Sequence, residues 1–273
     1  MTVLHEPVLL KEVIEELHIK NQGKYIDATE GAGGYTKAIV DAGGEVLGID
    51  ADDSMLEIAK QNVDSEKAKL VNGNFRNIKE IATRYDFYPA DGIVFDLGIS
   101  NVHFADEKRG FSFKNPDAIL DMRLNSETQG VMAKDLLNGL REDQLEELFG
   151  RSLALRIINF RKQKLFEKVG DLLSLFPEKK FADKTHPATK AFLMLRIAVN
   201  SELENLKETL PQAIEILKPG GRLVVVSFNS SEDEIVKHYL QSKSFVLPSD
   251  EEIKRNPKSR SAILRSYVKK NNS

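Results

Sequence analysis

Apolar and polar positions alternate in blocks over the first hundred residues of the chain. Short, continuous apolar runs recur at residues 24–28, 45–50, 69–72 and 90–98. Runs of this length are typical of strands that are buried on both faces of a sheet. The stretches between them carry apolar residues at helical spacing, at 36–42, 55–63 and 77–85. This alternation predicts a doubly wound α/β fold with a parallel sheet and right-handed crossovers.

The pattern changes between residues 102 and 200, where the chain is charged and mostly helical in period. Helices are predicted over 142–149, 152–164 and 169–175, and no segment has the pattern of a buried strand. A further helix opens at Thr185-His-Pro187, because proline suits a first helical position. Its apolar stripe has intervals of three and four and consists of Phe192, Leu195, Val199, Leu203, Leu206 and Leu210.

The pattern of a buried strand returns at residues 218–228, and a helix is predicted over 232–241. Residues 245–248 and 261–269 predict a closing pair of strands, with 251–257 as the link. We therefore expect one α/β domain, formed by residues 1–101 and 201–273. A helical insertion of about 100 residues, 102–200, interrupts it.

The composition narrows the possible chemistry. The chain has no cysteine, which excludes disulfides, cysteine-based metal sites and a thiolate nucleophile. The five histidines show no metal-binding spacing, and no metal is expected. No apolar run approaches the length of a membrane span, and the start of the chain lacks the blocks of a signal peptide. We expect a cytoplasmic protein without a membrane partner. Its net charge of −3 means that any binding of nucleic acid depends on local patches.

A glycine-rich turn follows the first predicted strand and reads Asp27-Ala-Thr-Glu-Gly-Ala-Gly33-Gly34. Glycines permit positive φ and close approach to a ligand, and the helix that follows presents free N–H groups. The turn lacks the last glycine of the dinucleotide fingerprint and the Lys-Ser/Thr of a phosphate loop. Asp50, 23 residues after Asp27, ends the second strand, where related folds hold a ribose. Two carboxylates without a phosphate fingerprint favour a cationic nucleoside such as S-adenosylmethionine. The alternative is a purely structural turn.

Three more residues are candidates for the same site. Asp96 closes the fourth predicted strand, where open α/β sheets bind ligands, and we predict that it accepts a hydrogen bond from the cofactor or the nucleophile. A helix cap or a loop carboxylate is the alternative. Phe75 follows the third strand, where an adenine would lie, or else belongs to the core. His103 follows the loop of Asp96.

Two segments are candidates for contacts with RNA. Arg109-Gly-Phe-Ser-Phe113 places a cation beside two aromatic residues on a loop, which suits an unpaired base. A loop packed on the insertion is the alternative. The basic residues near the end of the chain suit phosphates, or are simply solvated, and they are Lys254, Arg255, Lys258, Arg260, Arg265, Lys269 and Lys270.

Nearly the whole chain resembles the bacterial 16S rRNA (cytosine-N4)-methyltransferase family. Each matching stretch is short, but their order and spacing together are specific. The stretches are His5 to Glu12, Asp27 to Gly34, Gly48 to Asp50, Gly73 to Phe75, Asp91 to Ser100, Arg109 to Phe113, Leu120 to Arg123, His186 to Phe192, Leu195 to Leu203, Lys218 to Leu223, Glu232 to Asp233 and Asn256 to Ser261.

The resemblance implies a Rossmann-like methyltransferase core with a helical insertion that recognises RNA. It implies S-adenosylmethionine as the methyl donor and a cytosine in the decoding region of 16S rRNA, in the small ribosomal subunit, as the acceptor. It is compatible with a monomer or a homodimer. The residues implied to contact the cofactor are Gly33, Gly34, Tyr35, Asp50, Phe75, Asp96 and His103.

The chain also departs from the family pattern. Tyr35-Thr36 stands where relatives carry His-Ser, and Asn101-Val-His103 stands where they carry Ser-Pro-Gln. Phe228-Asn-Ser-Ser stands where they carry Phe-His-Ser-Leu. Asn229 cannot act as an acid or a base, so a role of that histidine does not transfer.

The exocyclic amine of cytosine is a poor nucleophile and has to be held in line with the methyl group while its proton is accepted. Many amino-methyltransferases use Asp/Asn-Pro-Pro-aromatic after the fourth strand, whereas this chain reads Asp96-Leu-Gly-Ile. Asp96 is the first catalytic candidate, with Asn229 and Ser227 lining the site. The lack of cysteine argues against covalent C5 methylation and radical methylation.

Three other functions remain open from the sequence. The first is a methyltransferase that acts on another RNA, on DNA or on a protein. The second is a non-enzymatic protein that binds RNA or the ribosome and keeps the fold. The third, a nicotinamide-dependent oxidoreductase, is disfavoured by the glycine spacing.

Overall fold

The computed structural model describes residues 7–63, 65–177 and 186–270, and these residues form two compact units. The first unit is Met1–Ser100 with Leu203–Ser273, and the second is Asn101–Glu202. These boundaries lie within two residues of the expected ones. His5 and Thr185, which belong to predicted motifs, lie outside the described residues.

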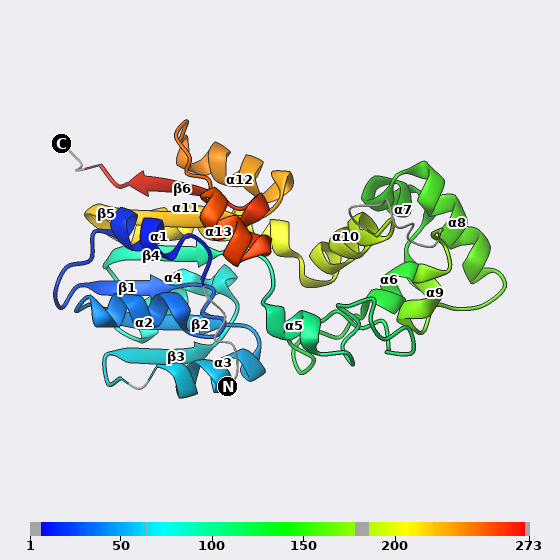
Figure 1. Cartoon of the computed structure of the whole chain (residues 1–273), viewed down its shortest axis with the longest axis horizontal. Helices are drawn as coiled ribbons and strands as arrows, with labels where there is room; N and C mark the ends of the chain where they lie inside the picture. Colours follow the sequence, from blue (N-terminus) through cyan, green and yellow to red (C-terminus); the bar gives the residue numbers. More distant parts are fainter. Residues whose placement is uncertain (1–6, 64, 178–185, 271–273) are drawn as a thin grey trace. The chain divides into compact units, whose positions relative to one another are not determined.

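The first unit contains a six-stranded sheet (Figure 1). Its order is β3-β2-β1-β4-β5-β6; β1 to β5 are parallel, and β6 runs antiparallel to β5. This arrangement confirms the predicted doubly wound α/β class. The strands are β1 (Lys24–Asp27), β2 (Glu45–Asp50), β3 (Ala68–Asn72), β4 (Ala90–Asp96), β5 (Leu217–Ser227) and β6 (Ile263–Val268).

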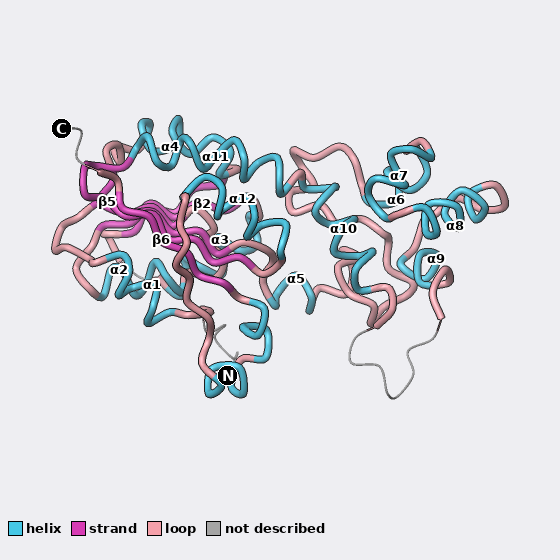
Figure 2. Tube along the Cα trace, turned by 90° about the horizontal axis from the view of Figure 1, so that it is seen from above, coloured by secondary structure: helices cyan, strands magenta, loops and turns pink. Residues whose placement is uncertain are grey.

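Helices cover both faces of the sheet, as Figure 2 shows. On one face α4 (Ile78–Arg84), α11 (Glu202–Ile216) and α12 (Ser230–Leu240) pack against the strands. On the other face α1 (Leu10–Leu17) and α2 (Gly34–Asp41) do so. The central strands are therefore buried on both sides, which explains their continuous apolar runs.

Four further elements complete the unit. Helix α3 (Asp53–Asn62) begins after Asp52, whose side chain accepts a hydrogen bond from the Ser54 N–H at 2.9 Å. The 3-10 turn η1 (Phe75–Asn77) follows β3. Helix α13 (Asp250–Arg255) and the 3-10 turn η2 (Pro257–Ser261) precede β6.

The predicted long helix after Pro187 is two helices. Helix α10 (Thr189–Asn200) ends at Ser201, which has a left-handed backbone with φ of 49°, and α11 follows. The Asn200 amide donates to the Met122 carbonyl and accepts from the Leu124 N–H, both at 2.9 Å. These contacts hold the end of α10 against a distant loop, so tertiary bonding overrides the continuous apolar stripe.

The predicted closing pair of strands is wrong in its first member. Only an isolated bridge joins Val246 to Leu264, and residues 251–255 of the expected link belong to α13. Phe245 and Leu247 are 54% and 56% exposed, and only Val246 between them packs, partly buried, against the core. The Arg265 guanidinium bonds the Ser242 carbonyl at 3.1 Å in place of a ladder of backbone bonds.

The second unit is helical, and its described residues contain no strand beyond an isolated bridge between Ile119 and Lys168. Arg161 ties it together, because one guanidinium nitrogen donates to the carbonyls of Leu137, Asn138 and Leu140. Besides α10, the helices are α5 (Asn101–Ala105), α6 (Ala133–Gly139), α7 (Glu142–Phe149), α8 (Arg151–Arg161) and α9 (Val169–Leu173).

Candidate functional site

Three carboxylates end three adjacent parallel strands at one edge of the sheet. Asp27 ends β1, Asp50 ends β2 and Asp96 ends β4. The Thr29 hydroxyl accepts a hydrogen bond from the Asp96 N–H at 2.6 Å, which ties the loop after β1 to the end of β4. This edge is where open parallel sheets bind ligands.

The glycine turn is held over this edge by Asp50. One Asp50 oxygen accepts from the Gly31 N–H and the other from the Asp52 N–H, both at 2.8 Å. Gly31 and Gly33 have φ of 55° and 87°, a conformation that disfavours side chains. A Cβ on Gly33 would come within 2.6 Å of the Val63 side chain. The turn therefore needs glycine both for its backbone and for its packing.

Two acids are buried beneath the turn. Asp27 and Glu30 are 0% and 2% exposed. The Thr36 hydroxyl lies 3.4 Å from Asp27 Oδ2 and also bonds Glu30 Oε2. Burial raises the pKa of Asp27 to about 7, against the opposing hydrogen bond from Thr29. Burial, reinforced by the charge of Asp27, raises the pKa of Glu30 well above its ordinary value.

Asp96 is the third acid with a raised pKa. Burial, with the charges of Asp27 and Glu232, raises the pKa of Asp96 to about 8, and Lys258 opposes that shift. Its Oδ1 is buried without a hydrogen-bond partner. An acid with a perturbed pKa at a ligand-binding edge is a functional candidate.

Four residues near these acids had no site role in the sequence-based prediction: Glu30, Thr36, Glu232 and Lys258. Lys258 was counted only with the basic residues near the end of the chain. The sequence signal for a role of Lys258 near the site is its position in the matching stretch Asn256 to Ser261. Glu232 lies in a matching stretch too, and its carboxylate accepts from the Phe228 N–H at 2.8 Å.

Gly34, Tyr35 and Phe75 are predicted to contact the cofactor. In the structure, the Cα of Gly34 and the side chains of Tyr35 and Phe75 pack against other residues of the protein. A Cβ on Gly34 would overlap the Pro7 ring. Tyr35 is 3% exposed, and its hydroxyl donates to the Val8 carbonyl. Gly34 and Tyr35 open α2, so their backbone N–H groups remain predicted ligand contacts. Phe75 packs edge-to-face on Phe95 at 5.8 Å and is partly buried, so its contact with adenine also stays a prediction.

Asn229 and Ser227 have structural partners. Asn229 is the N-cap of α12, and its side-chain oxygen accepts from the Glu232 N–H at 3.0 Å. Ser227 is buried and donates to the Ile263 carbonyl at 3.3 Å. Its function as the N-cap of α12 is sufficient to explain why position 229 is an asparagine, and no catalytic role is needed.

The loop from Arg109 to Phe113 packs its aromatic side chains within the insertion, which is the alternative interpretation of this segment, and not the one in which they meet an unpaired base. Phe111 is 5% exposed and lies edge-to-face with His103 at 5.5 Å. Phe113 packs on Phe192 at 4.5 Å. These rings hold the second unit together. His103 belongs to that unit, so its contact with the cofactor stays a prediction.

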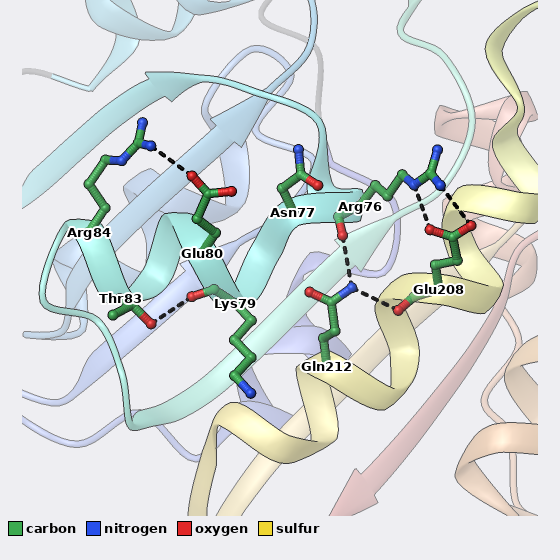
Figure 3. A pocket seen from close by; sticks show the side chains of 8 residues that line it. All are labelled: Arg76, Asn77, Lys79, Glu80, Thr83, Arg84, Glu208 and Gln212. Atoms are coloured by element: carbon green, nitrogen blue, oxygen red, sulfur yellow. Dashed lines mark hydrogen bonds and ion pairs between the residues drawn. The ribbon is translucent and has the colours of Figure 1, made fainter.

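An open groove of about 780 Å³ lies between α4 and α11 (Figure 3). Its walls are charged but neutralised, since Arg76 forms a two-pronged ion pair with Glu208 at 2.5 and 2.9 Å, and Arg84 bonds Glu80 at 2.7 Å. The groove lies between two helices, and both acids that line it, Glu80 and Glu208, are paired with arginines. It is therefore a weaker candidate than the sheet edge.

The described residues hold no cluster of three or more histidine and acidic side chains that would bind a metal ion. None of the described helices is both long and apolar enough to cross a membrane.

A model of the MraW methylase family matches residues 2–246. The chain belongs to the MraW methylase family. It is 39% identical to a "Ribosomal RNA small subunit methyltransferase H" of Dictyoglomus thermophilum, over 99% of this chain and 98% of that protein. A protein of the same name from Dehalococcoides mccartyi is 39% identical over 96% of this chain and 85% of its own length. A crystal structure of an rRNA methylase from Streptococcus thermophilus aligns with 96% of this member of the MraW family, at 12% identity and a TM-score of 0.46.

Proposed function

We propose that the protein transfers a methyl group from S-adenosylmethionine to the N4 amine of a cytosine in the decoding region of 16S rRNA. The observation that carries the proposal is the meeting of Asp27, Asp50 and Asp96 around a glycine turn in a chain of the MraW methylase family. Curated relatives that match nearly the full chain are named as rRNA small subunit methyltransferases.

The residues at the sheet edge suit a cationic nucleoside. Gly31 and Gly33 bring the backbone close to a ligand, and the start of α2 offers N–H groups to its carboxylate. Asp50 stands at the tip of β2, where a ribose is held in related folds. Asp27 and Glu30 place acidic groups beneath the turn, and Glu30 Oε1 has no hydrogen-bond partner. This excess of acid fits a ligand that carries positive charge and no phosphate.

When bound, the cofactor supplies a methyl group made electrophilic by the adjacent sulfonium. The chain's own part is to hold the amine and to accept its proton. The buried Oδ1 of Asp96, which has no hydrogen-bond partner, supports its assignment to that role. Its raised pKa means that the ionised form takes up a proton readily near neutral pH.

The second unit is the proposed RNA-recognition part, and the small ribosomal subunit or its RNA is the proposed partner. The net charge of −3 implies that contacts with RNA are local rather than spread over the whole surface. We expect the protein to act in the cytoplasm, as a monomer or a homodimer.

Mass spectrometry of rRNA nucleosides from strains with and without the gene tests the proposal. The expected result is loss of N4-methylcytosine in the deletion strain and its return on complementation. Unchanged N4-methylcytosine would exclude this acceptor, and loss of another methylated nucleoside would indicate a different one. Calorimetric titration with S-adenosylhomocysteine tests the cofactor separately.

A further inference from the structure

The carboxyl group of Glu30 is buried beneath the glycine turn, against Gly33 and Gly48. The residue is 2% exposed, and its Oε1 has no hydrogen-bond partner. Its carboxyl carbon lies 2.6 Å from the position that a Cβ on Gly48 would take. A Cβ on Gly33 would lie 3.3 Å from Oε1. A carboxylate with an unpartnered oxygen at such a buried position is costly, whereas a neutral carboxyl group is tolerated.

The hydrogen bonds around Thr36 require one more proton than its hydroxyl can supply. The Thr36 oxygen bonds Glu30 Oε2 and lies 3.4 Å from Asp27 Oδ2. A hydroxyl has one proton, so it donates to one carboxyl oxygen and has to accept from the other. Asp27 also accepts the Thr29 N–H at 3.2 Å, which favours its ionised form. The extra proton therefore belongs on Glu30.

We propose that Glu30, Thr36 and Asp27 form a proton-sharing relay in which Glu30 is the neutral acid and Asp27 the carboxylate offered to the cofactor. In this arrangement Glu30 Oε2 donates to Thr36, and Thr36 donates to Asp27. Glu30 is a positioning residue, because it acts on the ligand only through Asp27.

The charges that act on the relay are all negative. Asp27 acts on Glu30 from β1 and Asp50 acts from β2, while Asp50 acts on Asp27 in turn. Asp96, on β4, is also coupled to the charge of Asp27.

Helix α2 contributes the Thr36 hydroxyl, the Thr36 backbone N–H, which bonds Asp27, and the Tyr35 phenol, whose pKa is raised by burial and, in part, by the charge of Asp27. The α3 side contributes Ala59 and Val63, which are apolar. With no cation among these groups, the relay keeps its proton until a positive ligand arrives.

This last step rests on the proposed function. S-adenosylmethionine carries a net positive charge at neutral pH, and S-adenosylhomocysteine does not. Positive charge beside Asp27 favours loss of the Glu30 proton, which passes to the solvent and leaves a second carboxylate. Binding of the methyl donor thus releases up to one proton per site, and binding of the product releases less.

The ligand-free protein provides the first test, through the dependence of its melting temperature on pH. A group with a raised pKa in the folded state stabilises the fold at low pH, and this stability is lost as pH rises toward the folded pKa. The wild type is expected to lose stability between pH 5 and pH 8, and Glu30→Gln, an isostere of the neutral acid, to lose less. Glu57→Gln on the surface of α3, where that side chain is 68% exposed, is the matched control and should follow the wild type.

Parallel curves for Glu30→Gln and the wild type would overturn the relay. Thr36→Ser and Thr36→Val form a second pair that keeps or removes the hydroxyl. Thr36→Ser should reproduce the wild-type curve. The melting temperature of Thr36→Val should fall more steeply with pH, because Glu30 and Asp27 both lose the Thr36 hydroxyl. Equal curves for Thr36→Ser and Thr36→Val would also overturn the relay.

Calorimetry of S-adenosylmethionine binding in two buffers of different ionisation enthalpy counts the protons released. The wild type is expected to release a measurable fraction of a proton per site, and Glu30→Gln close to none. Equal release by the two proteins would overturn the relay while leaving the cofactor assignment intact. Absence of binding by the wild type would instead reject both the cofactor and the step that rests on it.

Discussion

The carboxyl group of Glu30 occupies the space that a side chain at position 48 would need. A Cβ on Gly48 would overlap Glu30 Oε2 and would come within 2.7 Å of the Leu70 side chain. Gly48 lies in the middle of β2, where glycine ordinarily weakens a strand. Its presence is explained by the acid that lies over it.

The contact between Glu30 and Gly48 predicts a compensating pair of substitutions. Gly48→Ala should destabilise the protein by about 1–3 kcal/mol, the usual cost of overpacking a core. In the background of Glu30→Ala the same substitution should cost less, since the carboxyl group has gone. Denaturant unfolding of the four proteins measures the coupling, and additive costs would contradict the contact.

Asp50 is predicted to support cofactor binding by holding the turn. Asp50→Ala removes the acceptor for the Gly31 and Asp52 N–H groups, and bonds to a charged acceptor contribute about 1.5–3 kcal/mol each. Affinity for S-adenosylhomocysteine in calorimetry should fall at least tenfold. Asp41→Asn, at the far end of α2, is the control and should bind as the wild type does. An unchanged affinity for Asp50→Ala would remove Asp50 from the site.

The raised pKa of Asp96 predicts that methylation activity rises with pH. Its pKa is raised to about 8, so below that pH most of the free enzyme has a protonated group that cannot accept a proton. The kcat/KM of methylation should increase up to tenfold per pH unit and level off above about pH 8. Asp96→Asn should reduce activity about 100-fold or more and flatten the profile. A wild-type profile that is flat from pH 6 to pH 9 would exclude Asp96 as the acceptor.

The same pKa has a consequence for stability with a defined sign. An acid whose folded-state pKa lies above its unfolded value contributes stability at low pH, which is lost as pH rises through about 8. In the ligand-free protein, the melting temperature of Asp96→Asn minus that of the wild type should therefore be more positive at pH 8 than at pH 5. The measurement is thermal unfolding at both pH values, and a difference of the opposite sign would contradict burial of the ionised group.

Asn229 is predicted to act as a helix cap and not in catalysis. Asn229→Asp keeps an acceptor for the Glu232 N–H and should preserve both stability and activity. Asn229→Ala loses the cap and should cost about 1 kcal/mol in unfolding free energy. Loss of rRNA methylation by an Asn229→Asp variant that folds normally would instead support a catalytic role for Asn229.

The sequence by itself determined the sheet, because the continuous apolar runs that form its strands are properties of neighbouring residues. It also placed Asp27, Asp50 and Asp96 at strand ends, and the ends of parallel strands meet at one edge whatever the loops do. It could not place the break at Ser201, since Asn200 is held by Met122 and Leu124, which lie far away in the chain.

The tertiary structure alone decided the environment of each acid. Glu30 becomes a buried neutral group because Gly48, on another strand, leaves room for it and Thr36 supplies its one partner. Asp96 acquires its raised pKa from burial and from the charges of Asp27 and Glu232, which no local pattern connects. Apolar periodicity is a local property of the chain, whereas burial and charge proximity depend on residues brought together from separate strands and helices. For this reason the sequence determined where the candidate site lies, and only the folded chain decided which of its acids are buried and which lie close together.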